Sequence, residues 1–217
     1  MAEIIKKIRL FGAGGHSKII QLIAKNDGVE IVEIFDDQPQ FDNLTQQNIT
    51  WNARKNPRGF SHKGHPFIIA IGNNYQRAEI AHFIKSEFYK IIHPSAVIAS
   101  NTKIGMGTVI YAGAVIQPNT TIGKHVIINT SASVDYDNSI DDFAHISPNA
   151  ALCGKVEIGE GSHIGAGAVI ISNVKIGKWS IIGAGTVVLK DVPDYAVVVG
   201  NPGKIIKINN PKTYAFL

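Results

Sequence analysis

The 217-residue chain is short of cysteine, of clustered charge and of long apolar runs. Its single cysteine, Cys153, excludes an internal disulfide framework and suits a reducing compartment. Lysine and arginine are scattered and the net charge is only +4, so neither nucleic-acid binding nor membrane binding is indicated. No apolar run at the N-terminus has the length of a signal peptide or a membrane span. We therefore expect a cytoplasmic protein with no membrane span.

Leucine is also scarce. It occurs 6 times against 35 isoleucines, although leucine is ordinarily the commonest residue of a globular protein. This imbalance disfavours a helix bundle, because isoleucine is branched at Cβ and suits a pleated surface. The hydrophobic share of 45% is enough for a sizeable core and excludes disorder for most of the chain. A mainly β protein is expected.

A strict six-residue repeat runs from position 92 to position 188. The residues at this spacing are all branched aliphatics: Ile92, Ile98, Ile104, Ile110, Ile116, Ile122, Ile128, Val134, Ile140, Ile146, Leu152, Ile158, Ile164, Ile170, Ile176, Ile182 and Val188. Four places after each stands a small or slim residue, with Asn138 the one misfit. Helices repeat every 3.6 residues and strands every 2, so a period of six indicates a short strand plus a corner. Coils of this kind stack into a solenoid at about 4.8 Å.

The first 90 residues alternate strands with helices instead. A strand over 8–11 runs into the glycine-rich stretch 12–17, a helix follows over 18–25, and a strand over 29–35 ends in Asp36 and Asp37. This order matches a dinucleotide-binding fingerprint, with Ser17 in place of the third glycine. A third strand over 66–71 ends in Gly72 and Asn73, and a helix is predicted over 75–87. Residues 38–65 are assigned to a long loop or irregular insertion.

The predicted fold is therefore mainly β with a small α/β domain. A truncated Rossmann-like βαβ domain spans 1–90, a β-helix spans 91–193, and a C-terminal cap or tail spans 194–217. Ligands of open α/β sheets bind at the carboxyl ends of the strands. The residues that converge there are Gly14, Gly15, His16, Asp36, Asp37, Gly72 and Asn73.

The order of these motifs resembles one family over nearly the whole chain. GAGGHSK, an FDD strand end and IGNN, then a hexad repeat ending in KDVPDYAVVVGNPGKIIK, are similar to the sialic-acid and bacillosamine-type sugar acetyltransferases. The resemblance implies a left-handed parallel β-helix with three hexads to a triangular coil, in a homotrimer that holds acetyl-CoA between prisms. It also implies a nucleotide-sugar substrate, UDP-linked by preference, on the glycine loop and acidic strand end, and a role in surface glycan or lipopolysaccharide synthesis.

The resemblance also assigns residues to the acetyl-CoA site. It places His145 beside acetyl-CoA and the pantetheine arm along the backbone of Gly165, Ala166, Gly183 and Ala184. Charge alone makes Lys204 or Lys207 a candidate for the adenosine phosphates. No metal is expected, because the histidines at 125, 145 and 163 occupy different places in the hexad. His125 and His163 are interpreted as solvated, and Cys153 as a small buried or interface residue.

The catalytic motif departs from the family. Where the family has a histidine base in Val-Asp-His-Asp, this chain reads Val-Asp-Tyr136-Asp137. A phenol with a pKa of about 10 is a poor base at neutral pH. The catalytic candidates are therefore Tyr136, Asp137 and His145, and the family mechanism does not transfer directly.

Four accounts of the missing base stay open. Asp137, His16 or His145 supplies a base from elsewhere; the amine binds neutral and reacts by positioning; Tyr136 orients the amine or donates to the oxyanion; or the protein binds without catalysis. The expected activity is transfer of acetyl from acetyl-CoA to the amino group of a nucleotide-linked amino sugar. The main alternative is O-acetylation of a sugar or sialic acid. Because a hydroxyl needs a base more than an amine does, Tyr136 favours N-acetylation. An alternative of another class is a nucleotide- or NAD-binding module.

Overall fold

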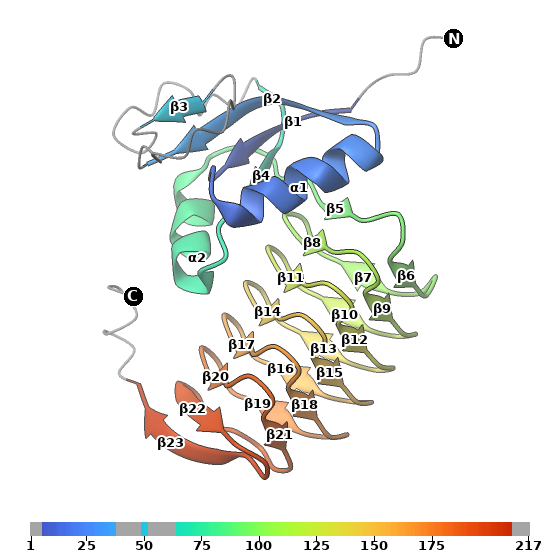
Figure 1. Ribbon diagram of the computed structural model, residues 1–217, viewed down its shortest axis with the longest axis vertical. Helices are drawn as coiled ribbons and strands as arrows, with labels where there is room; N and C mark the ends of the chain where they lie inside the picture. The colour runs from blue at the N-terminus through green and yellow to red at the C-terminus, as the bar shows by residue number, and fades with distance from the viewer. Residues whose placement is uncertain (1–5, 38–48, 52–63, 210–217) are drawn as a thin grey trace.

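The computed structural model describes residues 6–37, 49–51 and 64–209 and shows a small α/β domain on the end of a long β-solenoid (Figure 1). The elements of the α/β domain are β1 (Lys6–Phe11), α1 (Gly15–Asn26), β2 (Val29–Asp36), β3 (Ile49–Trp51), β4 (Phe67–Ile69) and α2 (Asn74–Phe83). Its four strands form a parallel sheet in the order β3-β2-β1-β4. The three predicted strands and two predicted helices are therefore present in this domain, in the expected order, and β3 is an additional strand.

One helix boundary and one additional strand differ from the sequence predictions. The second helix was predicted to reach residue 87 but ends at Phe83, because Ile84 takes an extended conformation with ψ 114°. The segment predicted to be irregular over 38–65 contains β3, which extends the sheet beside β2. The remainder of that segment up to residue 63 lies outside the described residues.

The solenoid is a triangular prism, and each of its three faces is a sheet of parallel strands. Face A contains β5 (Ile91–Ile92), β8 (Val109–Ile110), β11 (Ile127–Ile128), β14 (His145–Ile146), β17 (His163–Ile164), β20 (Ile181–Ile182), β22 (Ala196–Val199) and the antiparallel β23 (Lys204–Ile208). Face B contains β6 (Val97–Ile98), β9 (Val115–Ile116), β12 (Ser133–Val134), β15 (Ala151–Leu152), β18 (Val169–Ile170) and β21 (Val187–Val188). Face C contains β7 (Lys103–Ile104), β10 (Thr121–Ile122), β13 (Ser139–Ile140), β16 (Glu157–Ile158) and β19 (Lys175–Ile176).

Paired strands are 18 residues apart, so three hexads make one coil, as predicted. The repeated aliphatic residues point to the prism axis, and from Ile110 to Val188 each is at most 2% exposed. The prediction of a left-handed β-helix behind a small α/β domain is confirmed. The strand β22 continues face A beyond residue 193, and β23 lies along its edge. The predicted domain boundaries remain predictions.

Each corner of the prism uses one residue in the left-handed conformation. From Gly107 to Gly185 these positive φ values recur every six residues, and the non-glycine examples include Asn119, Asp137 and Asn149. Asparagine and aspartate tolerate this region better than most residues. The corners are therefore encoded by the same period as the core.

Asn138 closes one of these corners by hydrogen bonds. It is 2% exposed, its Nδ2 donates to the carbonyls of Asp135 (2.6 Å) and Cys153 (3.0 Å), and its Oδ1 accepts from Val156 N (2.9 Å). Thr120 makes the matching bond to the Asp135 carbonyl from the coil above. Asn138 therefore interrupts the pattern of small residues because its side chain closes this corner by hydrogen bonds.

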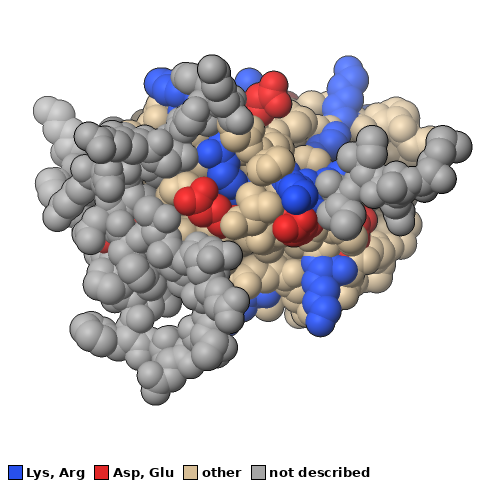
Figure 2. Space-filling model, turned by 90° about the horizontal axis from the view of Figure 1, so that it is seen from above, with Lys and Arg blue, Asp and Glu red and all other residues tan. Residues whose placement is uncertain are grey.

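The α/β domain packs on the first coils through one hydrophobic cluster, which joins Ile8 and Leu10 of β1 to Ile91, Val109 and Tyr111 of the prism. Seen from above, lysine and arginine lie interspersed with aspartate and glutamate over the described surface (Figure 2). Within the described ranges no helix is long and apolar enough to cross a membrane.

Candidate functional site

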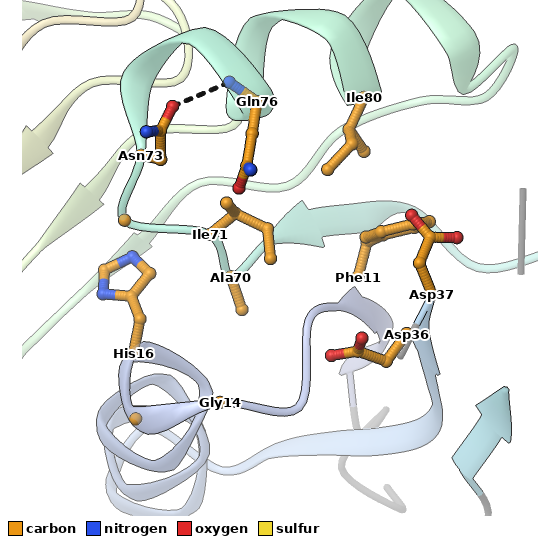
Figure 3. Close-up of a pocket in the computed structure, with 12 residues that line it drawn as sticks. Phe11, Gly14, His16, Asp36, Asp37, Ala70, Ile71, Asn73, Gln76 and Ile80 are labelled. Atoms are coloured by element: carbon orange, nitrogen blue, oxygen red, sulfur yellow. Dashed lines mark hydrogen bonds between the residues drawn. The ribbon is translucent and has the colours of Figure 1, made fainter. Parts of the chain in front are cut away.

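A cavity of about 490 Å³ opens at the carboxyl ends of β1, β2 and β4 (Figure 3). Its lining includes all seven residues that the sequence placed there: Gly14, Gly15, His16, Asp36, Asp37, Gly72 and Asn73. The sequence did not single out Gln76, whose side chain points into the cavity from the first turn of α2. The signal for it was its place three residues after the helix cap Asn73.

The glycine-rich loop is held tightly against its neighbours. Gly12 has φ +115°, and a Cβ there would lie 2.6 Å from the Ala70 carbonyl oxygen. Asp36 Oδ2 accepts a hydrogen bond from Ala13 N at 2.7 Å, which ties the end of β2 to the loop. The N-cap of α1 is Gly14, and no side chain caps the helix. The first backbone N–H groups of α1 therefore remain available to an anionic ligand.

The cavity has two chemically different ends. The carboxylates of Asp36 and Asp37 lie at one end, and His16 and Asn73 lie at the other (Figure 3). Among the lining residues that the structure describes, none is a lysine or an arginine. Phosphate groups would therefore be held by backbone N–H groups and neutral side chains, while the carboxylates suit the hydroxyls or N–H groups of a nucleoside.

His16 reaches from this cavity to the prism. Its Nδ1 is hydrogen-bonded to the hydroxyl of Tyr111, and its Nε2 is buried with no partner among the described residues. Burial, aided by the positive charge of Arg77, lowers the pKa of His16 to about 4. The imidazole is therefore neutral at physiological pH, and it is a weak base.

His145 lies on the outer side of face A, and its tautomer follows from its neighbours. Thr130 N donates to Asn129 Oδ1 (2.8 Å), so the amide of Asn129 turns its Nδ2 toward His145 Nε2 (3.1 Å). Since an amide nitrogen only donates, His145 Nε2 accepts and Nδ1 carries the proton. Burial, together with the charges of His163, Arg77 and His16, lowers the pKa of His145 to about 2, against a weak opposing effect of the Gly72 backbone. His145 is thus a neutral donor and a poor base.

The interpretation of His125 and His163 as solvated was wrong. His125 is 4% exposed, packed edge-on to Phe88 and stacked on Phe143 at 5.2 Å. His163 is partly buried, with its ring 4.7 Å from that of His145 and its Nε2 2.9 Å from Ser147 Oγ. Both occupy outward positions of the hexad, but the α/β domain covers the corner that carries His125.

Tyr136 and Asp137 lie on the corner between faces B and C, opposite the face that carries His145. The Tyr136 side chain is 47% exposed and rests over Gly154 of the next coil, where a Cβ would come 2.5 Å from the ring. Asp137 Oδ1 accepts from Asn119 Nδ2 at 3.0 Å. One chain alone therefore does not bring Tyr136 and Asp137 to the cavity or to His145.

The residues predicted to meet the pantetheine lie on the corner between faces A and B, beside His145. Gly165-Ala166 follows β17 and Gly183-Ala184 follows β20, one coil further on. The next residues are Gly167 and Gly185, and a Cβ at either would meet nothing within 4 Å. These two stacked corners form a bare surface on which a ligand can approach the backbone closely.

The last predicted contacts lie at the far end of the prism. Lys204 lines a cavity of about 500 Å³ beside β21 and β23, and Lys207 is exposed on β23. Their proposed contact with the adenosine phosphates stays a prediction. Within the described ranges, no three His, Cys, Asp or Glu side chains are grouped so that they could hold a metal ion.

Family comparisons agree with this architecture. The family model of the bacterial transferase hexapeptide (six repeats) matches residues 101–135, 139–172 and 155–190, and that of the PglD N-terminal domain matches residues 7–84. Repeat, fold and cavity together define a hexapeptide-repeat transferase with a PglD-type N-terminal domain.

Solved structures of two acetyltransferases are similar to this chain over nearly their whole length. A histidine-to-asparagine mutant of perosamine N-acetyltransferase from Caulobacter crescentus, in complex with CoA and GDP-perosamine, is 32% identical, with TM-score 0.86 over 94% of this chain and 98% of that chain. The acetyltransferase domain of PglB from Neisseria gonorrhoeae, in complex with acetyl coenzyme A, is 34% identical, with TM-score 0.82 over 93% and 99%. The chain belongs to the hexapeptide-repeat sugar N-acetyltransferases.

A curated relative gives a shorter match. UDP-N-acetylbacillosamine N-acetyltransferase from Bacillus subtilis is 38% identical over 115 residues, which are 48% of this chain and 50% of that protein. The match thus spans about half the length of the curated relative, and the particular acceptor of this chain is a matter for proposal.

Proposed function

We propose that this protein transfers acetyl from acetyl-CoA to the amino group of a nucleotide-linked amino sugar. The observation that carries the proposal is the cavity at the end of the parallel sheet, in which a glycine loop, a helix N-terminus and two carboxylates meet. Its chemistry suits a nucleoside diphosphate, and relatives of the same fold bind GDP-perosamine, CoA or acetyl-CoA. UDP-linked sugars are the favoured acceptors, for surface glycan or lipopolysaccharide synthesis.

We propose that the active form is a homotrimer, because the site is incomplete in one chain. The outward residues of face B are short and mostly apolar: Val97, Val115, Ser133, Ala151, Val169 and Val187. Those of face C are polar: Lys103, Thr121, Ser139, Glu157 and Lys175. Packing through face B would bring the Tyr136 corner of one copy to the A–B corner of the next.

In this arrangement the reaction relies on positioning more than on a protein base. The sugar amine enters neutral and attacks the thioester carbonyl, the C–S bond breaks, the CoA thiolate leaves, and the extra proton passes to water. His16 and His145, with pKa values of about 4 and about 2, are too weak to serve as the base. His145 acts as a positioning group at the acetyl end, and the exposed Tyr136 hydroxyl orients the amine.

The test is a transfer assay with the purified full chain, acetyl-CoA, and UDP-, GDP- and dTDP-linked amino sugars. Release of free CoA thiol with one of these sugars, and acetylation of that sugar by mass spectrometry, is the expected result. Thermal stabilisation by NAD without any response to CoA would contradict the proposal. Acetylation of a hydroxyl in an amine-free sugar or sialic acid would point to O-acetyl transfer instead.

The oligomer is tested separately by light scattering on the eluted protein. A mass of three chains is expected, and Ala151→Arg on face B should reduce it to one chain with loss of transfer. A monomeric wild-type protein with full activity would refute the shared site. Cytoplasmic localisation is part of the same proposal, because acetyl-CoA and nucleotide sugars are made there and because the chain has a single cysteine.

A further inference from the structure

One edge of the prism presents a column of corner residues to helix α2. Between faces C and A the left-handed positions of successive coils are Gly107, His125, Phe143, Gly161 and Trp179. The rings of this column meet the helix directly: Phe143 stacks on His82 at 6.3 Å, and Trp179 meets Tyr75 edge-on at 6.0 Å. Helix α2 therefore lies along this edge, where the α/β domain joins the solenoid (Figure 1).

The coil-to-coil hydrogen bonds leave the carbonyls of this column unused. The amides of His125, Phe143 and Gly161 each donate to the coil above, at 2.9 to 3.0 Å. Within the described residues, their carbonyls accept from no backbone amide. A covered carbonyl without a donor is costly, so the docked helix must supply one for each.

Two side chains of α2 supply these donors. Arg77 Nε donates to the His125 carbonyl (2.8 Å) and Nη2 to the Phe143 carbonyl (2.7 Å), while Asn74 Nδ2 donates to the Gly161 carbonyl (2.9 Å). Three residues of helix rise about 4.5 Å and coils are spaced by about 4.8 Å. The side chains at 74 and 77 therefore fit the coil repeat in a single register.

The same guanidinium also holds the loop that lines the cavity. Arg77 Nη1 donates to the carbonyls of Ile71 (3.0 Å) and Gly72 (3.1 Å). Its Nη2 approaches the carbonyl of Ala144, the residue before His145, at 3.4 Å. One side chain, 1% exposed, thus connects the cavity loop to the coil that carries His145.

In the part of the chain that the structure describes, no carboxylate contacts Arg77. Its positive charge is balanced instead by the dipoles of the carbonyl groups that accept its hydrogen bonds. This arrangement needs the planar fork of arginine, since a lysine ammonium cannot reach carbonyls on two coils and in the loop together. Burial is the main cause of the lowered pKa values of His16, which lines the cavity, and of His145, and the positive charge of Arg77 acts in the same direction.

We propose that Arg77, assisted by Asn74, is a positioning residue for acetyl transfer: it fixes the register between the acceptor cavity and the prism, and so the placement of the Gly72 loop over His145. This inference rests on the proposed function for its kinetic consequence. Its structural consequence, an ordered loop at 71–77, does not depend on the reaction.

The test compares Arg77→Lys and Asn74→Ala with the control Arg9→Lys in the full chain. Arg9 is also buried, at 4% exposure, but it donates to the His65 carbonyl (2.7 Å) and Ser86 (3.3 Å) within the α/β domain. The Arg77 variant should lose about 10²-fold in kcat and the Asn74 variant about tenfold, since small misplacements at a reacting centre have effects of this size. Dissociation constants for UDP and for CoA should stay within about threefold, and the control should keep kcat within about twofold.

Hydrogen exchange followed by mass spectrometry measures the order of the loop without depending on acetyl transfer. Amides of residues 71–77 should exchange faster in Arg77→Lys than in wild type, and those in Arg9→Lys should not. Wild-type kcat in a folded Arg77→Lys, a loss confined to UDP or CoA binding, or unchanged exchange at 71–77 would overturn the proposal. If the wild-type protein transfers acetyl to no sugar, the proposed function fails. The exchange result still shows whether Arg77 holds the loop at 71–77 in register with the prism.

Discussion

Lowering the pH should destabilise this protein through histidines that are buried in their neutral form. His125 shows the effect most simply, because it lies in the interface between the domains and away from the cavity. It is 4% exposed, and its Nδ1 has no hydrogen-bond partner among the described residues. Burial, helped by the positive charges of Arg77, Lys124 and His82, lowers its pKa from 6.5 to about 4.

The sign of the pH effect follows from proton linkage. The unfolded chain binds a proton at His125 near pH 6.5, whereas the folded chain binds it only near pH 4. The contribution of the neutral His125 to the free energy of unfolding is therefore present above pH 6.5 and is lost as the pH falls from 6.5 towards 4. One pKa unit corresponds to 1.36 kcal/mol, so at pH 5 His125 alone should cost about 2 kcal/mol per chain. The depressed pKa values of His16 and His145 act in the same direction.

Urea unfolding at pH 7.5 and pH 5 measures this loss. The His125→Phe variant removes the titrating group and places a ring that the corner accepts, since Phe143 occupies the next coil of the same column with φ 61°. The difference between the two pH values should be smaller in this variant than in wild type by about 2 kcal/mol. His65→Gln, at an exposed site, serves as the control and should behave as wild type. An equal pH dependence in His125→Phe and wild type would refute the reasoning.

Three further changes have defined outcomes. Asn138→Ala should lower the free energy of unfolding in urea by about 2 kcal/mol, because the buried Val156 N–H loses its acceptor. Asn138→Thr should be nearly neutral, and equal losses in the two variants would contradict the corner role. His145→Ala should lower acetyl transfer more than Tyr136→Phe does, and wild-type rates in both would remove these groups from the mechanism. Gly12→Ala should destabilise by about 2 kcal/mol, since its φ is +115° and its Cβ would touch a carbonyl oxygen; an unchanged melting temperature would show that the loop relaxes.

The cavity was predictable from sequence to an unusual degree. Asp36 ends β2, and Gly14 and Gly72 come shortly after β1 and β4. The carboxyl ends of parallel strands share one edge of the sheet, so local patterns were enough to bring these residues together. Tyr111 and Arg77, which hold His16 and the Gly72 loop, were not found. Tyr111 lies 95 residues from His16 in the chain, and no short-range pattern relates the two.

The sequence by itself determined the prism. The period of six is local, and one aliphatic residue per hexad is buried whatever surrounds the coil, so the scarcity of leucine and the excess of isoleucine already describe the axial core. The tertiary structure decided how the α/β domain docks on that prism. Arg77 donates to carbonyls 48 and 66 residues away, and this contact, with the burial of His125, depends on a remote helix meeting the corner column. The burial and protonation of the histidines follow from that docking, because both depend on what covers a residue rather than on where it stands in the repeat.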